Sequence, residues 1–260
     1  MRAVALVGGI LLASSAMADV TPAVRADLAP TGTLRAAINY GNAILATKDR
    51  ATGESRGVAV DLMHDIGTRL GVPAAIVAYD SVAVMGDAAP SGAWDIAFLG
   101  SDPAREALMG FTAAYLEIDA TYLVPGVSPL RTAADVDREG VRVAAPARAN
   151  YELYLGRNLK RAKLVSAPGA DAAFQMLATG QVEALAGLTQ FLLGLAPKLP
   201  GSRPVEGRFM GVQQSIAVPR GKNAGLAFLR AVVEDAKRSG LVARAIERTG
   251  ARGVSVAPAG

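Results

Sequence analysis

Short apolar stretches alternate with amphipathic stretches along the first part of the chain. Residues 60–70 carry apolar side chains at positions 62, 63, 66 and 70, which is the spacing of one face of a helix. Short strands that alternate with helices are typical of βαβ units and a largely parallel sheet. The strands predicted in this part are 34–38, 74–78 and 94–99.

The same alternation begins again after residue 140. It predicts helices at 151–159 and 171–179, and strands at 141–145, 162–165, 182–186 and 214–218. The C-terminal stretch 224–249 is apolar at helical spacing and is divided by Ser239-Gly240, which predicts two amphipathic helices. We therefore predict an α/β protein with two similar lobes.

Residues 1–18 have the pattern of a secretory signal peptide. Met1 and Arg2 precede an apolar run, and the small residues Ala16 and Ala18 form a cleavage site. The run is much shorter than the roughly 20 residues that a membrane-spanning helix needs. We expect cleavage after Ala18 and a mature protein in the periplasm.

The charge of the chain gives no sign of a nucleic-acid partner. The formal net charge is +4, and removal of residues 1–18 would lower it by one, because that segment holds Arg2 and no acid. The Lys and Arg residues are scattered, and few aromatic residues lie among them to stack on bases. We expect no nucleic-acid binding.

The composition also limits the chemistry of the protein. The sequence contains no cysteine, which excludes disulfides and a cysteine nucleophile. The one histidine, His64, lies opposite the apolar face of the predicted helix 60–70, so we expect it to be solvent-exposed rather than catalytic. A zinc site would have to be built from carboxylates. We expect no metal and no cofactor.

Three groups of segments carry a more specific signal. They are Leu34 to Asn42 with Gly57 to Leu62, Trp94 to Arg105 with Phe111 to Tyr115, and Gly140 to Leu155. Together they resemble the periplasmic solute-binding proteins of ABC importers, in particular the polar amino-acid-binding class (family 3). The resemblance covers about residues 30 to 255.

This resemblance implies the type II periplasmic binding fold. In that fold two Rossmann-like α/β lobes are joined by two crossing strands, and the ligand lies in the cleft between them. Lobe 1 would comprise residues 30–123 and 217–255, and lobe 2 residues 124–216, with crossings near 121–125 and 216–219. The family further implies a small-molecule solute as ligand, an inner-membrane ABC permease as partner, and a monomeric chain.

Arg105 is the first candidate for a ligand contact. In the family, the arginine at this place of the motif binds the carboxylate of the ligand. A planar guanidinium meets both carboxylate oxygens at once, which a lysine cannot do equally well. Gly100 and Ser101 stand where the family offers backbone groups and a hydroxyl to the same carboxylate. Asp102, which precedes Pro103, is better explained as a helix N-cap.

Further candidates follow the first predicted strand. Asn39, Tyr40 and Asn42 come at its carboxyl end, where open α/β sheets bind their ligands. Asn side chains offer both a donor and an acceptor, and Tyr40 offers an apolar ring with a polar tip. Asn42 could equally be a turn residue beside Gly41, and Tyr115 could be either a cleft residue or a core residue.

The sequence departs from the family at the start of the second lobe's first helix. The expected Gly-Ser/Thr pair is Arg148-Ala149 here, so the hydroxyl that would help to bind an anion is missing. The backbone amides of Ala149 and Asn150 could still receive an anion at the helix N-terminus, and Arg148 could add a second positive group.

A second departure concerns the acid that pairs with the α-ammonium of amino-acid ligands. Leu188 stands at that position. A buried ammonium without a partner is costly, so a plain carboxylate is favoured unless Glu117, Asp119 or another acid substitutes. Gln190 and Gln214 offer neutral amides, which suit hydroxyl, amide or carboxylate groups.

Other functions remain open on the same scaffold. One is a periplasmic, dehydratase-like enzyme, and another is a binding module associated with a sensor. The candidate residues include no clear pair of titratable groups that would divide acid and base roles. We therefore expect a protein that binds an amino acid or a related organic acid and catalyses no reaction.

Overall fold

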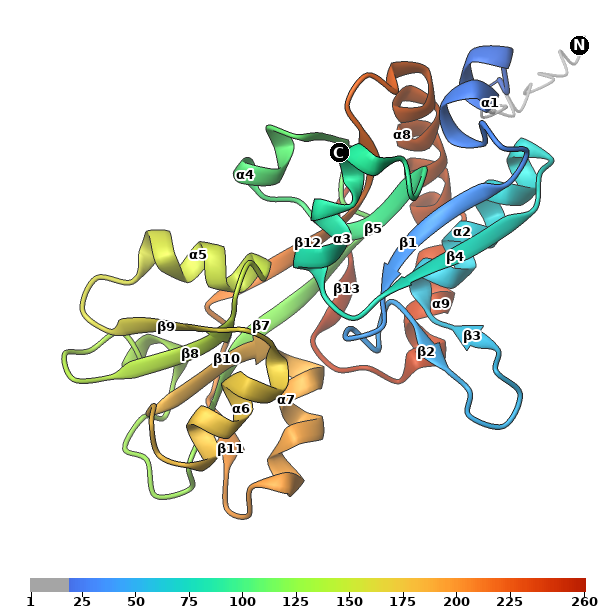
Figure 1. Ribbon diagram of the computed structural model, residues 1–260. Coiled ribbons are helices and arrows are strands. Elements are labelled where there is room, and N and C mark those ends of the chain that lie inside the picture. Colours follow the sequence, from blue (N-terminus) through green and yellow to red (C-terminus); the bar gives the residue numbers. More distant parts are fainter. Residues whose placement is uncertain (1–18) are drawn as a thin grey trace, which may run out of the picture.

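The protein consists of two α/β lobes that share one continuous, curled sheet, and a separate two-stranded sheet is formed by β2 (Thr47–Lys48) and β3 (Ser55–Arg56) (Figure 1). The computed structural model describes residues 19–260, so the predicted signal peptide, residues 1–18, lies outside the described residues. Along the sheet the strand order is β4-β1-β5-β12-β7-β10-β8-β9. The fold is the type II periplasmic binding fold that the resemblance predicted.

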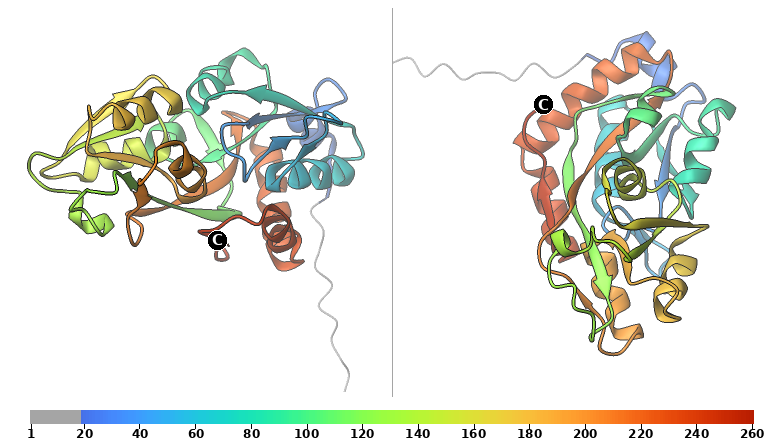
Figure 2. Two further views of the ribbon diagram at one scale, coloured as in Figure 1. Left: turned by 90° about the horizontal axis from the view of Figure 1, so that it is seen from below. Right: turned by 90° about the vertical axis from the view of Figure 1, so that its left-hand side faces the viewer.

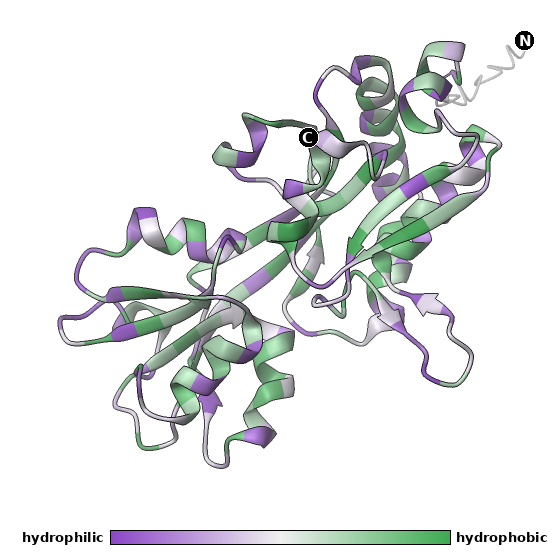
Figure 3. Ribbon diagram, viewed as in Figure 1, coloured by the Kyte–Doolittle hydropathy of each residue, from purple (hydrophilic) through white to green (hydrophobic). Residues whose placement is uncertain are grey.

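Lobe 1 has a parallel sheet whose strands β1 and β5 are buried on both faces. β1 (Leu34–Asn39) pairs with β4 (Ala74–Tyr79) on one side and with β5 (Ile96–Gly100) on the other. Alternate side chains of β1 and β5 pack into two different cores. Burial on both faces explains why these strands are apolar almost throughout, as Figure 3 shows.

Helices cover both faces of this sheet. One face is covered by α1 (Pro22–Leu28), α2 (Val58–Leu70), α8 (Asn223–Arg238) and α9 (Leu241–Thr249). On the other face lie α3 (Val82–Asp87), Trp94 and the 3₁₀ turn Ala89–Ser91. His64 of α2 is exposed, as its helical position predicted. Lobe 1 also contains the short helix α4 (Pro103–Glu106) and the short strands β2, β3 and β6 (Met109–Phe111).

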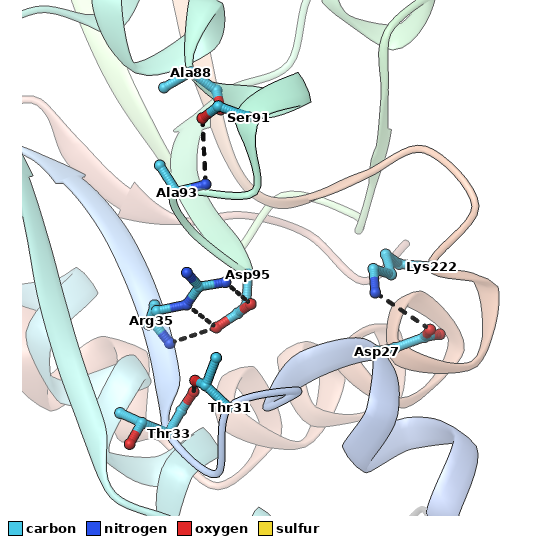
Figure 4. A network of polar contacts seen from close by, with 9 residues as sticks. All are labelled: Asp27, Thr31, Thr33, Arg35, Ala88, Ser91, Ala93, Asp95 and Lys222. Carbon is cyan, nitrogen blue, oxygen red and sulfur yellow. Dashed lines mark hydrogen bonds and ion pairs between the residues drawn. The ribbon is translucent and has the colours of Figure 1, made fainter.

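An ion pair joins two strands of lobe 1 at the end away from the cleft (Figure 4). Asp95, which is buried, accepts hydrogen bonds from the backbone N and the Nε of Arg35, at 2.9 and 3.0 Å, and from its Nη2 at 2.7 Å. These bonds raise the pKa of Arg35. The pair fixes the start of β5 against β1.

Lobe 2 repeats the arrangement on a smaller scale. β8 (Arg142–Pro146) pairs in parallel with β9 (Lys163–Ala167) and β10 (Ala184–Leu188). One core lies under α5 (Asn150–Asn158), and a second lies under α6 (Ala170–Ala178) and α7 (Thr189–Leu195).

Two long antiparallel strands run between the lobes, as both views of Figure 2 show. Residues 116–120 of β7 (Leu116–Val124) pair with residues 210–214 of β12 (Met210–Pro219). Beyond this shared segment, β7 pairs with β10 of lobe 2 and β12 pairs with β5 of lobe 1. The short strands β11 (Arg203–Pro204) and β13 (Val254–Val256) also pair with β7.

The predicted strands and helices are all present, with ends shifted by a few residues. The short helices α1, α3 and α7 were not predicted, because they are too brief to show a helical period in the sequence. β12 begins before the predicted strand 214–218, because it continues along β7. Within residues 19–260, no helix is both long enough and apolar enough to cross a membrane.

Candidate functional site

A cleft of about 200 Å³ lies between the two lobes. Its lobe 1 wall contains residues that follow β1 and β4 and the end of β5, and its lobe 2 wall contains residues that follow β8 and β9 and the end of β10. Both walls therefore consist of the carboxyl ends of parallel strands, which is where open α/β sheets bind ligands.

Several predicted site residues line this cleft. Asn39 ends β1 and Asn42 follows it, Gly100 ends β5, and Gln214 lies on the crossing strand β12. The lobe 2 wall adds Ala149 and Asn150 at the start of α5. The structure thus brings together six of the predicted residues from both lobes and one crossing strand.

Asn42 is both a turn residue and a cleft residue. Its Oδ1 accepts a hydrogen bond from the backbone N of Ile44 at 3.2 Å, and the Oδ1 of Asn39 accepts one from Gly41 at 2.8 Å. Each amide group thus orders the turn through its oxygen. Both side chains line the cleft with a neutral polar group.

The remaining predicted residues lie elsewhere. Tyr115 is fully buried in the lobe 1 core, edge-on to Phe98, and burial raises its pKa. The hydroxyl of Tyr40 pairs with the Oγ of Ser55 at 2.5 Å. Gln190 lines a neighbouring hollow, where its Oε1 accepts a hydrogen bond from the backbone N of Arg252. Ser101 faces a different hollow, beside Gln213.

Arg105 lies beside the cleft and bridges the lobes. Its Nη1 donates to the carbonyl of Gly100 at 2.7 Å and to the Oδ1 of Asn150 at 2.5 Å, and its Nη2 donates to the carbonyl of Arg148 at 2.6 Å. Burial lowers the pKa of Arg105 to about 10. Asp102 caps α4, as predicted, through a hydrogen bond from the backbone N of Ala104 at 2.9 Å.

Two helix N-termini face the cleft from lobe 2. Ala149 and Gly169 are the N-cap residues of α5 and α6, and neither has a side chain that caps the helix. The first backbone N–H groups of a helix lack partners within the helix, and the helix dipole makes this end positive. The lobe 2 wall therefore favours a negatively charged group of a ligand.

The cleft contains few ionisable groups. Among the described residues that line it, Asp80 is the one acidic side chain and no lysine or arginine is present. Leu188 lines the cleft, so no acid stands at this position. Glu117 and Asp119 are not part of the lining, and both form ion pairs with Arg208. Within residues 19–260, no cluster of metal-ligating side chains is found.

The sequence reasoning missed several lining residues. Asp80 and Ser81 follow β4, while Tyr151 and Phe191 bring aromatic rings from α5 and α7. Asp80 and Ser81 stand at the carboxyl end of a strand that is visible in the sequence, where open α/β sheets bind ligands, and this position is the signal that identifies them. The aromatic residues carry no comparable signal in the sequence.

The fold and the cleft define a two-lobed solute-binding protein. The chain belongs to the bacterial extracellular solute-binding proteins of family 3, whose family model matches residues 34–250. No curated protein sequence matches the chain.

Solved structures share the fold at low sequence identity. A mutant of the arginine-binding protein ArgBP from T. maritima has a TM-score of 0.72 at 21% identity, over 88% of this chain and 99% of that one. An amino acid ABC transporter substrate-binding protein from Streptococcus pneumoniae, bound to L-arginine, has a TM-score of 0.73 at 20% identity, over 91% and 100%. The ancestral amino acid-binding protein AncCDT-1, a precursor of cyclohexadienyl dehydratase, has a TM-score of 0.69 at 21% identity, over 84% and 94%.

Proposed function

We propose that the chain is the solute-binding component of an ABC importer and that it captures a small carboxylate-bearing solute, an amino acid or a related organic acid, in the cleft. The observation that carries this proposal is the lobe 2 wall, where the uncapped N-termini of α5 and α6 face the cleft. Such ends attract a carboxylate. Neutral amides on the other surfaces would hold the rest of the solute.

In this proposal Arg105 contributes the positive charge for the carboxylate. Among residues 19–260, its hydrogen-bond partners are all neutral oxygens. A carboxylate accepts a charge-assisted hydrogen bond from an arginine more strongly than an amide or carbonyl oxygen does. The solute would thus provide a partner that the protein itself lacks.

The solute's other end would meet lobe 1. Because Leu188 lines the cleft, an α-ammonium beside it would be left without a partner. Asp80 is exposed and lines the opposite wall, where it could pair with a cationic group. We therefore favour a plain carboxylate, or an amino acid whose positive group reaches Asp80.

The family supports a proposed cellular role. We propose that residues 1–18 are cleaved as a signal peptide, that the mature chain is a monomer in the periplasm, and that it delivers its solute to an inner-membrane permease. Lobe 1 would comprise residues 30–123 and 217–255, and lobe 2 would comprise residues 124–216. The two lobes would move relative to each other about β7 and β12.

We propose no reaction for this cleft. Most of the similar solved structures are binding proteins, although AncCDT-1 is a precursor of a dehydratase. General acid and base catalysis needs two titratable groups with separated roles. Among the described lining residues, Asp80 is the one carboxylate that could take such a role.

Calorimetric titration of the purified protein tests the proposed function. The panel pairs each of several amino acids with its deaminated analogue, and the controls are the same compounds with the carboxylate converted to a neutral amide group. We expect saturable binding of at least one carboxylate and none of its amide. Binding of the amide as tightly as the acid would contradict a carboxylate site.

A further inference from the structure

The side chain of Asn150 crosses from lobe 2 to lobe 1. Asn150 is the first residue of α5, and it is buried. Its Oδ1 accepts the hydrogen bond from Nη1 of Arg105 at 2.5 Å, and its Nδ2 donates to the carbonyl of Ser101 at 2.6 Å. Both groups of the amide are therefore used in contacts with the other lobe.

Lobe 1 has a matching space for this amide. A Cβ atom on Gly100 would come within 2.5 to 2.7 Å of the Oδ1, Cγ and Nδ2 of Asn150. Any side chain at position 100 would therefore collide with the amide. Because Gly100 has no side chain, the planar amide of Asn150 packs directly against it. The Arg105 guanidinium lies beside this amide.

An amide and a carboxylate have the same planar shape and differ in charge. The Oδ1 of Asn150 presents to Arg105 the kind of acceptor that a carboxylate oxygen would present, but without the negative charge. A carboxylate forms the stronger bond to a guanidinium, so it can replace the amide. The two acceptors compete for one donor group.

Two ion pairs also join the lobes near Arg105 and Asn150. Arg148 forms a two-pronged pair with Asp87 of α3, at 2.9 and 2.8 Å, and Arg157 of α5 pairs with Asp102 at 2.8 Å. Each pair joins lobe 2 to lobe 1. Asn150 thus lies within a set of contacts that hold the two lobes together.

We propose that the Asn150 amide occupies the place on Arg105 that a solute's carboxylate would take, so that Asn150 holds the two lobes together and sets the affinity for carboxylates. The second half rests on the proposed function, because it assumes that the carboxylate binds Arg105. A molecule with closed lobes does not admit a solute. The apparent affinity therefore equals the intrinsic affinity multiplied by the fraction of molecules with open lobes. Asn150 is then a specificity residue that acts by competition.

Substitutions at position 150 with opposite expected effects test this proposal. Asn150→Ala removes the competitor, and Asn150→Asp replaces it with a carboxylate that a solute cannot easily displace. Asn158, at the exposed end of the same helix, provides the matched controls Asn158→Ala and Asn158→Asp. Circular dichroism checks folding, and Asn150→Ser, whose side chain is too short to reach Arg105, replaces Asn150→Ala if that variant folds poorly.

Small-angle scattering without ligand gives the first readout, and calorimetry with succinate and L-glutamine gives the second. We expect Asn150→Ala to have a larger radius of gyration than the wild type and to bind these carboxylates up to about tenfold more tightly. Asn150→Asp should stay as compact as the wild type and bind them at least about tenfold more weakly. The Asn158 variants should match the wild type in both measurements.

Two results separate this inference from the proposed function. Equal radii and equal carboxylate affinities for the wild type and both Asn150 variants would overturn the inference and leave the proposed function intact. If no chain binds any carboxylate but Asn150→Ala still expands, the proposed function fails and the role of Asn150 in holding the lobes together stands.

Discussion

The backbone at Arg148 suits glycine better than arginine, and this leads to a stability prediction. Arg148 has a φ of 62°, and it is the one residue other than glycine with a positive φ among residues 19–260. It lies in the turn between β8 and α5, between the cleft-lining residues Ala147 and Ala149. A residue with a Cβ in this left-handed region costs about 1 kcal/mol, because the Cβ approaches the following carbonyl oxygen.

Comparing Arg148→Ala with Arg148→Gly isolates this backbone cost. Both substitutions remove the ion pair with Asp87, so its contribution cancels between them. Alanine keeps the Cβ and glycine lacks it, so we expect the glycine variant to be more stable than the alanine variant by about 1 kcal/mol. With a urea m-value of about 2–3 kcal/mol/M, the midpoints should differ by roughly 0.3–0.5 M.

Urea unfolding followed by circular dichroism and by the fluorescence of Trp94 measures this difference. Trp94 is the one tryptophan of the chain and is buried in lobe 1, so agreement of the two signals shows that both lobes unfold together. Arg161, which is exposed and has a negative φ, is the matched control, where alanine should be at least as stable as glycine. A glycine variant at position 148 with a midpoint equal to or below that of alanine would refute the backbone argument.

Two predictions concern the ligand. Arg105→Lys should weaken carboxylate binding at least about tenfold with the fold intact, because a single ammonium replaces the planar donor group; equal affinities by calorimetry would remove Arg105 from the site. Leu188→Asp should improve the binding of an α-amino acid relative to its deaminated analogue, because the carboxylate meets the ammonium. Tight binding of α-amino acids by the wild type, unchanged in Leu188→Asp, would contradict that idea.

Part of the candidate site followed from local sequence alone. Asn39 and Asn42 were expected at the cleft because they follow a strand, and the strand is visible as an apolar stretch. Asp102 was expected to cap a helix, and it does. Each of these expectations needs only neighbouring residues, which is why the sequence was sufficient.

The direction of single side chains was harder to predict. Tyr115 and Tyr40 belong to segments near the cleft, but Tyr115 points into the lobe 1 core and Tyr40 points toward Ser55. A one-residue change of strand register would turn a side chain to the opposite face. That register comes from pairing with β12 and β5, which are distant in the sequence.

The sequence by itself determined the α/β class, the two-lobed arrangement and the exposed position of His64, because apolar periodicity within each segment dictates which face must be buried. Only the tertiary structure decided that Arg105 meets Asn150. The two residues are separated by 45 positions and lie on different lobes. Their contact depends on how two separately folded sheets meet across β7 and β12, and no local pattern encodes that distance.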